Sequence, residues 1–345
     1  MNNLITKWLA LIGLAFFLSS CSEPEPISKL VMVQGKTMGT YYKVTVVLSE
    51  EQLNKPVYAL NTLQLKIDEK LELVNDQMST YRPHSELSSF NQTEKSLKVS
   101  PETAFVVQSS LALFELSQGA FDVTVGPLVN LWGFGPDKKP NKVPSNEVIA
   151  SQKEKVGSEK LTVNENTLIK SIPDLYVDLS AIAKGYGVDV VAEYLQSIGI
   201  SDYLVDIGGE LRAKGVKPLN KQWTLAIEKP VEGQSVQRII HIGDNGIATS
   251  GDYRNYYEFD GIRYSHTIDP KTGKPINHKL VSVTVIHPSS MMADGFATTI
   301  MVLGPEAGLI FAKDNNLAVF LLVKQGDDFI EHFTAEFEPY LFEEK

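Results

Sequence analysis

The 345-residue sequence contains a single cysteine, Cys21, and this scarcity excludes several kinds of site. Without a second thiol the chain forms no internal disulfide, and its body has no catalytic thiol or cysteine-ligated metal centre. Only six histidines are present, none in an H-x-x-x-H or similar pairing, which argues against a zinc site. The sequence also lacks a basic surplus. Its net charge of −10 argues against a nucleic-acid partner, whose phosphates are neutralised by Lys and Arg.

Long hydrophobic runs are equally rare, and the one that matters stands at the N-terminus. Lys7 precedes an apolar stretch over 8–17, and Leu18-Ser-Ser-Cys21 matches a lipoprotein cleavage box. We therefore predict a signal peptide over 1–20 and a lipidated Cys21 as the first mature residue. An ordinary secretory signal with a stray cysteine is the alternative. No later apolar run reaches the roughly 18 residues that span a bilayer.

This N-terminus predicts where the protein resides. The polar, proline-containing residues 21–29 form a tether, and residues 30–345 form the folded body. We expect a membrane-anchored lipoprotein that faces the periplasm of a Gram-negative bacterium. Ser22, which follows the cysteine, favours the outer membrane, but the inner membrane stays open.

The pattern of the body mixes strands and helices without steady β-α-β alternation, which favours an α+β fold with mixed sheets and packed helices. Strands are expected at 41–48, 203–206, 223–227, 246–249, 263–268, 281–286 and, as the last one, 317–323. Helices are expected at 57–75, from Pro101 until Gly119, at 292–302 and from Pro305. Residues 134–160 are rich in proline and lysine and are interpreted as an excursion from the main body.

The segment 177–189 has the features of a binding site for an anionic ligand. We predict a short strand over 175–178, an N-cap at Ser180 and a helix that ends at Gly199. Glycine is disfavoured inside helices by about 1 kcal/mol, yet Gly185 and Gly187 stand in the first two turns.

These glycines indicate that something large or close lies against the start of this helix. Lys184 adds a cation near the helix N-terminus, where backbone N–H groups attract phosphate. A close helix–sheet contact with a solvated lysine is the alternative.

Asp294 and Thr298 stand four residues apart in a predicted helix, so they share one face. Two such oxygen ligands suit Mg²⁺, which keeps several waters and is often completed by substrate phosphates. In the alternative, Asp294 caps the first turn and Thr298 packs in the core. His266 stands within the predicted strand 263–268 and has the chemistry of a base near neutral pH, a structural histidine being the alternative.

Other segments are less specific. Asp122 follows a helix in an apolar setting, and the segments 37–41 and 78–90 carry aromatic and sulfur side chains. Such groups stack on flat ring systems, although core packing explains them equally well. Residues 250–254 are interpreted as a turn after a strand.

Taken in order, the motifs resemble one family, the ApbE-type FAD:protein FMN transferases. The similarity runs from about Thr37 to Gly304 and comprises T-M-G-T, M-S-T-Y-R-P-x-S-E-L-S-x-F-N, A-F-D-V-T-V-G-P-L, V-D-L-S-A-I-A-K-G-Y, D-I-G-G-E, S-G-D-Y-R-N-Y, Y-S-H-T-I-D-P-x-T-G-x-P and A-D-G-x-A-T. The lipoprotein signal also fits this family, many of whose members are periplasmic lipoproteins.

The resemblance implies an ApbE-like, T-fold-related architecture with a smaller accessory lobe. It implies an enzyme that binds FAD and, with Mg²⁺, transfers FMN to a threonine hydroxyl of a partner protein and releases AMP. Asp294 and Thr298 match the metal ligands, with the carbonyl of Ala181 as a third, and His266 matches the general base, so that His266 and Asp294 are the implied catalytic residues. The matching FAD contacts are Met38, Tyr81, Ala120, Phe121, Asp122, Asp178, Lys184 and Thr267.

Thr267 departs from the apolar residue that is common after the histidine, so the resemblance supports its FAD contact least. Family targets carry an Asp-x-x-Thr/Ser-Gly-Ala-Thr type sequence, typically in subunits of ion-pumping redox complexes. This chain has no such sequence and is expected to modify other proteins. Two alternatives stay open: an FAD pyrophosphatase that yields FMN and AMP, and a flavin-binding lipoprotein without turnover.

Overall fold

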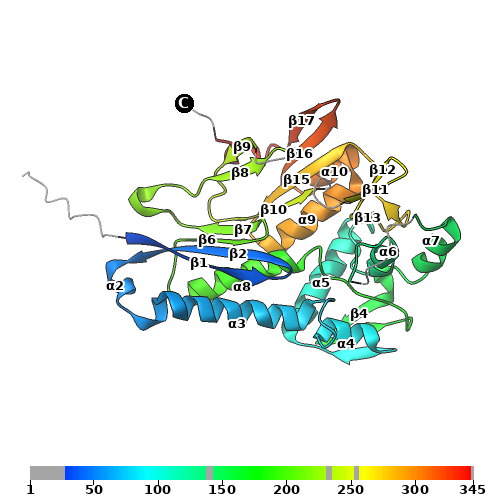
Figure 1. Ribbon diagram of the computed structural model, residues 1–345, viewed down its shortest axis with the longest axis horizontal. Coiled ribbons are helices and arrows are strands. Elements are labelled where there is room, and N and C mark those ends of the chain that lie inside the picture. Colours follow the sequence, from blue (N-terminus) through cyan, green and yellow to red (C-terminus); the bar gives the residue numbers. More distant parts are fainter. Residues whose placement is uncertain (1–27, 137–142, 231–234, 252–255, 343–345) are drawn as a thin grey trace, which may run out of the picture.

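The computed structural model describes residues 28–136, 143–230, 235–251 and 256–342. An eight-stranded sheet crosses the molecule in the order β1-β2-β6-β7-β10-β15-β16-β17, and every strand pairing in the described part of the chain is antiparallel (Figure 1). Its strands are β1 (Ser28–Thr37), β2 (Thr40–Ser49), β6 (Tyr203–Ile207), β7 (Glu210–Lys214), β10 (Gly246–Gly251), β15 (Leu280–His287), β16 (Ala318–Gln325) and β17 (Asp328–Phe333).

Helices cover one face of this sheet and stand at one end of it (Figure 1). The α-helices are α2 (Glu50–Leu53), α3 (Leu60–Met78), α4 (Glu86–Gln92), α5 (Pro101–Leu116), α6 (Gly126–Leu131), α7 (Asn146–Lys153), α8 (Ala183–Ser197), α9 (Ser290–Leu303) and α10 (Pro305–Asp314). Short 3₁₀ turns occupy Pro56–Tyr58, Ser158–Lys160, Pro218–Asn220 and Glu338–Tyr340. None of the helices in the described ranges is both long and apolar enough to traverse a bilayer.

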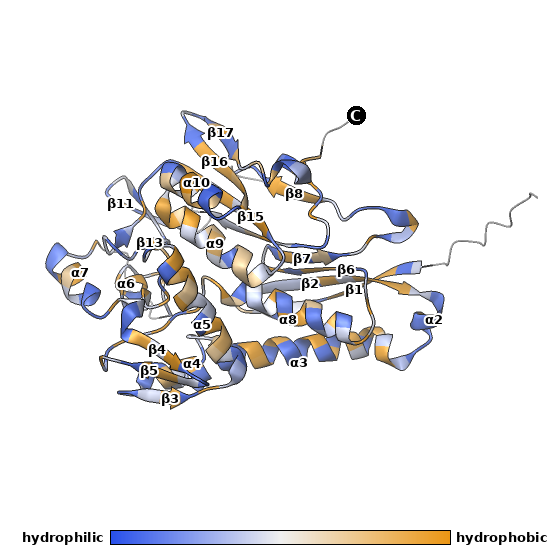
Figure 2. Cartoon of the chain, turned by 180° about the vertical axis from the view of Figure 1, so that it is seen from behind, coloured by the Kyte–Doolittle hydropathy of each residue, from blue (hydrophilic) through white to orange (hydrophobic). Residues whose placement is uncertain are grey.

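The sequence pattern explains how the sheet and helices meet. β2 buries every second residue, with Tyr42, Val44, Val46 and Leu48 directed to one side. α3 buries residues three or four apart, and Figure 2 shows both hydrophilic and hydrophobic colours along it. α3, α8 and the sheet thereby share one core.

The opposite face of the sheet is covered differently. A hairpin of β8 (Leu225–Glu228) and β9 (Val236–Ile240) lies over it with the C-terminal segment, around a core that includes Trp223 and Phe337. Three smaller groups of strands complete the fold: β3 (Ser96–Lys98) with β5 (Thr167–Lys170) and β4 (Leu161–Asn164), β11 (Tyr256–Phe259) with β12 (Ile262–Ser265), and β13 (Ile268–Asp269) with β14 (Lys274–Pro275).

The expected excursion over 134–160 forms part of a small separate core. Its described part places Ile149 of α7 and Val156 against Leu128, Trp132 and Ile268. Residues 137–142 lie outside the described ranges. The cluster around Trp132 and Ile149 forms a small lobe beside the main sheet, and residues of this lobe also line the cavity described below.

The α+β class is confirmed, and several element boundaries differ from expectation. α3 runs over 60–78 rather than 57–75, because Pro56 begins a separate 3₁₀ turn. The strand expected at 223–227 begins at Leu225, and β17 follows the strand expected to be the last. Residues Ser28 and Lys29, assigned to the tether, already belong to β1, while the signal peptide and Cys21 lie outside the described residues.

Candidate active site

One cavity of about 350 Å³ brings together most of the predicted site residues. Its walls come from the loop before α6, the segment entering α8, β7, β10, the link between β12 and β13, and α9. The predicted residues that line it are Tyr81, Ala120, Phe121, Asp122, Asp178, Ala181, Lys184, His266, Thr267, Asp294 and Thr298. Met38 instead lines an adjoining cavity of about 680 Å³, which shares Tyr81, Ser180 and Lys184 with the first.

The segment entering α8 is not a strand followed by a capped helix, as the sequence suggested. Residues 175–178 have no strand pairing, and α8 begins at Ala183 with Ile182 in the N-cap position. The carboxylate of Asp178 accepts hydrogen bonds from the N–H and hydroxyl of Ser180, at 2.9 and 2.5 Å. An Asp side chain that binds the backbone two residues on favours a turn, so Ser180 is held there and does not cap.

The two glycines of α8 allow close approach of other parts of the protein. A Cβ on Gly185 would lie 2.2 Å from the carbonyl oxygen of Ser290 in α9, and one on Gly187 would lie 2.8 Å from the Met38 side chain. The close neighbour that the sequence predicted is therefore another helix together with Met38. Both glycines are buried in this contact.

α8 and α9 also meet through a charged group. The N–H of Gly185 would donate to the carbonyl of Ala181 in a helix begun at Ser180, but it donates to Asp294 Oδ2, at 3.1 Å. The carbonyl of Ala181 thus stands outside the helical hydrogen-bond pattern, and Ala181 is among the residues that line the cavity.

Asp294 is buried, and burial raises its pKa from 3.8 to about 7, with Lys184 acting in the opposite direction and Glu210 adding to the rise. It does not cap α9, because the N-cap is Ser289, whose hydroxyl accepts from the N–H of Met292. Asp294 therefore stands in the second turn rather than the first. Thr298 follows one turn later, with Oγ1 3.3 Å from Ser250 Oγ.

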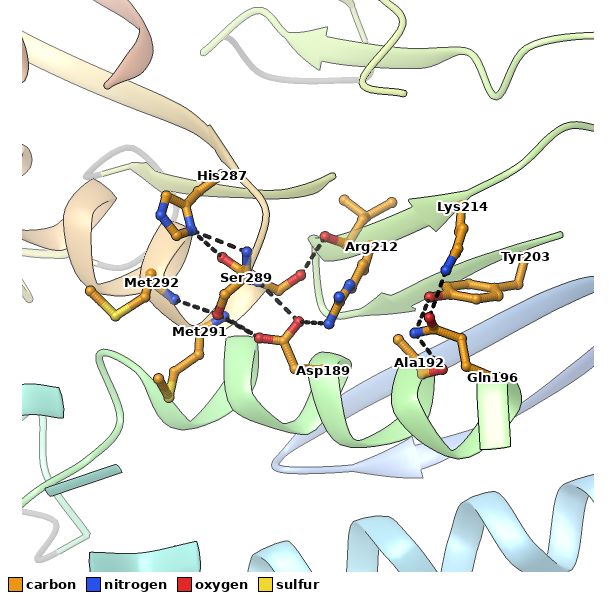
Figure 3. A network of polar contacts seen from close by, with 12 residues as sticks. Asp189, Ala192, Gln196, Tyr203, Arg212, Lys214, His287, Ser289, Met291 and Met292 are labelled. Carbon is orange, nitrogen blue, oxygen red and sulfur yellow. Dashed lines mark hydrogen bonds and ion pairs between the residues drawn. The ribbon is translucent and has the colours of Figure 1, made fainter. Parts of the chain in front are cut away.

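A separate carboxylate fixes α9 against α8. Asp189, in the middle of α8, accepts hydrogen bonds from the hydroxyl of Ser289 at 2.7 Å and from the N–H groups of Ser290 and Met291 at 3.0 Å each (Figure 3). It also pairs with Arg212 at 2.7 Å. These bonds satisfy N–H groups that a helix N-terminus leaves without internal partners, and they fix the position of α9 and hence of Asp294.

Asp122 lines the cavity, but its carboxylate is engaged within the protein. Oδ1 accepts from the N–H and hydroxyl of Thr124 at 2.8 and 2.6 Å and from the hydroxyl of Ser158 at 2.7 Å. This network ties the loop before α6 to the end of the 134–160 excursion. Asp122 therefore shapes the wall of the cavity.

His266 lies in a bend between β12 and β13, not within a strand. The predicted strand 263–268 breaks there because Ser265 Oγ accepts from the N–H of Thr267, at 3.2 Å, a side-chain contact that favours a turn. The ring of Phe134 meets the His266 ring edge-on, with centroids 6.4 Å apart. Behind it, Phe134, Tyr257, Tyr264 and Trp132 form a continuous series of stacked rings.

Comparison with known proteins identifies the family. The ApbE family profile matches residues 38–321. The chain belongs to the ApbE family. It is 52% identical to the FAD:protein FMN transferase of Vibrio cholerae, with 97% of this chain and 99% of that protein covered, and 40% identical to that of Escherichia coli, with 98% of each covered.

Solved ApbE structures have the same fold. The flavin transferase ApbE of V. cholerae matches with a TM-score of 0.85 at 51% identity, covering 91% of this chain and all of that one. The apo flavinyl transferase ApbE of Pseudomonas stutzeri matches with a TM-score of 0.83 at 40% identity, covering 90% of this chain and 96% of that one. The predicted ApbE membership and fold are confirmed.

One residue of this ApbE-family cavity escaped the sequence analysis. Glu210 begins β7, directly after the Gly208-Gly209 turn, whose φ angles of 65° and 105° favour glycine. Its carboxylate forms an ion pair with Lys184, whose side chain keeps 34% exposure toward the cavity. Burial opposes the charge on Lys184, but Asp294 and Glu210 outweigh it and raise the lysine pKa. Glu210 is the last residue of the motif D-I-G-G-E, but the sequence does not indicate that its partner is Lys184.

The donor set suits a hard cation. Asp294, Thr298 and Ala181 offer only oxygen, and a buried carboxylate whose charge is disfavoured would gain from a cation beside it. Within the described ranges no three His, Cys, Asp or Glu side chains cluster as a metal site. A small set of oxygen ligands fits an ion such as Mg²⁺, which completes its shell with water and substrate oxygens. The motif residues 252–255 lie outside the described part.

Proposed function

We propose that this ApbE-family protein is an FAD:protein FMN transferase that uses Mg²⁺, modifies a threonine hydroxyl of a partner protein and releases AMP. One observation carries the proposal: a single cavity is lined by an oxygen pair on α9, a lysine at the start of α8 and a histidine. These are the groups needed to hold a diphosphate and to accept a hydroxyl proton. The names of the relatives in V. cholerae and E. coli support the same activity.

The reaction divides among the residues as follows. Lys184 and the N-terminus of α8 bind the diphosphate. His266 accepts the proton of the threonine hydroxyl, whose oxygen bonds to the phosphorus of the FMN half. The bond from that phosphorus to the oxygen of AMP breaks, and AMP leaves with the electron pair.

Asp294, Thr298 and the carbonyl of Ala181 would hold Mg²⁺, and the bound ion would offset the negative charge that develops on the diphosphate. Asp122 and Asp178, which are engaged in internal hydrogen bonds, orient the walls of the site. Of the remaining predicted FAD contacts, Tyr81, Phe121 and Met38 offer apolar or aromatic surface for the flavin ring.

We also propose where the protein is anchored and which kind of protein it modifies. Cys21 is lipidated, the tether holds the body at a membrane facing the periplasm, and the target is a subunit of an ion-pumping redox complex with an Asp-x-x-Thr/Ser-Gly-Ala-Thr type sequence. Acyl-chain analysis of the purified protein, with Cys21→Ser as the comparison, tests the anchor.

One incubation tests the activity. The mature protein is mixed with FAD, MgCl₂ and a target domain, and intact-mass spectrometry and chromatography follow the products. Addition of FMN to the target threonine with an equal amount of AMP is expected, and none with the target Thr→Ala variant. Free FMN and AMP with an unmodified target would show a pyrophosphatase instead, and bound FAD without AMP would show a flavin-binding protein.

A further inference from the structure

Glu210 stands out among the groups that line the cavity because half of its carboxylate is without a partner. The residue is only 3% exposed. Its Oε1 accepts from Lys184 Nζ, whereas Oε2 is buried and accepts no hydrogen bond from any residue in the described part of the chain. A buried acceptor left without a donor is destabilising, and such groups are rare in folded proteins.

Among the described residues, no neighbouring group donates a hydrogen bond to Oε2. Lys184 already donates to the other oxygen, and the other charged groups near Glu210, which are Asp294 and Asp206, are themselves carboxylates. Burial accordingly raises the pKa of Glu210, against the effect of Lys184. Glu210 is among the residues that line the cavity, whereas Oε2 itself is covered, so a group that fills the cavity would donate to Oε2 only once the glutamate side chain turns toward it.

The chemistry of that donor follows from the position of Glu210. A carboxylate accepts hydrogen bonds and repels phosphate. Lys184, its ion-pair partner, marks the phosphate side of the site, so the donor belongs to a group close to the phosphates. In a dinucleotide those groups are the hydroxyls of the polyol chain and of the ribose, which acidic residues are known to bind in other dinucleotide sites.

We propose that Glu210 Oε2 accepts a hydrogen bond from a ribityl or ribose hydroxyl of the bound dinucleotide, which makes Glu210 a ligand-positioning residue. This inference rests on the proposed function, because it takes FAD as the occupant. The glutamate would serve two purposes with its two oxygens. One keeps the Lys184 ammonium group beside the phosphates, and the other fixes the neighbouring sugar.

Binding measurements on Glu210→Gln test the proposal. The mature chain and the variant are titrated with FAD, with FAD analogues that each lack one ribityl hydroxyl, and with analogues that lack one ribose hydroxyl. Glu210→Gln is expected to weaken FAD binding about tenfold, as for one hydrogen bond to a charged group. Asp202→Asn is the matched control, because this part-buried carboxylate just before the adjacent strand β6 accepts a hydrogen bond from the N–H of Val216 and does not line the cavity.

The analogues separate a direct contact from an effect through Lys184. If Glu210 binds one hydroxyl, the analogue lacking it loses affinity for the wild-type protein, and Glu210→Gln then adds no further loss. The identity of that analogue tells whether the ribityl chain or the ribose is held.

Equal losses with FAD and with every analogue would mean that Glu210 acts only through Lys184, and this would overturn the proposal, as would unchanged FAD binding by Glu210→Gln. If the wild-type protein bound no FAD, the proposed function itself would fail, which is a different result. Thermal unfolding confirms that the variant is folded, and Glu210→Asp, which keeps the charge, is run through the same cycle if it is not.

Discussion

Two buried aspartates on neighbouring helices have opposite environments. Asp189 of α8 is 6% exposed and Asp294 of α9 is 5% exposed. Asp189 accepts bonds from three donors of the α9 N-terminus and pairs with Arg212 (Figure 3). Asp294 accepts one hydrogen bond from the described residues, that of Gly185. The two carboxylates are buried to nearly the same extent, so burial does not distinguish them. They differ in the number of hydrogen-bond donors that each one accepts from.

This difference separates a group that holds the fold from one available to a ligand. A carboxylate with a full set of donors stabilises the joint between the helices. A buried carboxylate with one donor carries an unfavourable charge until another cation or donor arrives, and its raised pKa reflects this. Glu210, with one oxygen unpartnered, belongs with Asp294 in this respect.

The largest effect is expected from Asp294→Asn. Loss of groups beyond the direct ligands of a metal costs about 10–100-fold, so removal of a direct ligand should reduce Mg²⁺-dependent turnover by at least about 100-fold. The fold should survive, because asparagine still accepts from Gly185 and carries no buried charge. AMP release and thermal unfolding measure the two effects, with the exposed Asp314→Asn as control. A wild-type rate would remove the metal assignment.

Asp189→Ala should act on stability. It leaves Arg212 and the donors of Ser289, Ser290 and Met291 without their acceptor, and breaking a buried ion pair costs about 3–5 kcal/mol. Urea unfolding of the variant measures the change. A loss well below 1 kcal/mol would mean that water replaces the carboxylate and that the joint is less important than its hydrogen bonds indicate.

His266→Ala should slow transfer while FAD binding stays largely intact. General-base catalysis contributes about 100-fold or more, and the ring is not part of the α8–α9 joint. Rates of target modification and FAD fluorescence titrations measure the two properties separately. Weakened FAD binding with an unchanged rate at saturation would make His266 a ligand contact.

The smallest expected effect is a change in how the free energy of unfolding depends on pH, through His287 near the contact between α8 and α9. Burial lowers the pKa of His287 below its usual 6.5, although Ser289 and Asp189 oppose the shift. A histidine with a depressed folded pKa contributes stability above pH 6.5 that is lost as the pH falls. His287→Asn should therefore flatten the decline in unfolding free energy below pH 6.5. An unaltered pH profile would exclude this histidine as its source.

Local pattern predicted local structure well where one force dominates. The run of β-branched and aromatic residues over 41–48 and the Ser100-Pro101 start correspond to β2 and α5, because strand propensity and an N-cap depend on nearby residues. The predicted N-cap at Ser180 and the predicted strand over 263–268 were wrong for the same reason. In each case a neighbouring side chain, Asp178 or Ser265, accepts a hydrogen bond from the backbone two residues later and favours a turn. The periodicity of apolar residues does not reveal where a side-chain hydrogen bond to the backbone competes with a helix or strand.

The sequence named many of the residues that line the cavity, but it did not predict which of them contact one another. Family motifs named the residues that converge on the cavity, whereas Glu210 became visible only through its ion pair with Lys184. The glycines of α8 were rightly taken to mark close approach, but the neighbour proved to be α9. Contacts between residues 100 positions apart, such as Asp189 with Ser289, leave no trace in local spacing.

The cavity walls are contributed by segments that span the chain from Tyr81 to Val302. No contiguous piece shorter than that range contains a complete set of these walls, so the cavity exists only in a chain that has folded over the whole range. A chain that ended before α9 would have Lys184 and Ala181 but would lack Asp294, Thr298 and the contact between α8 and α9 that positions them.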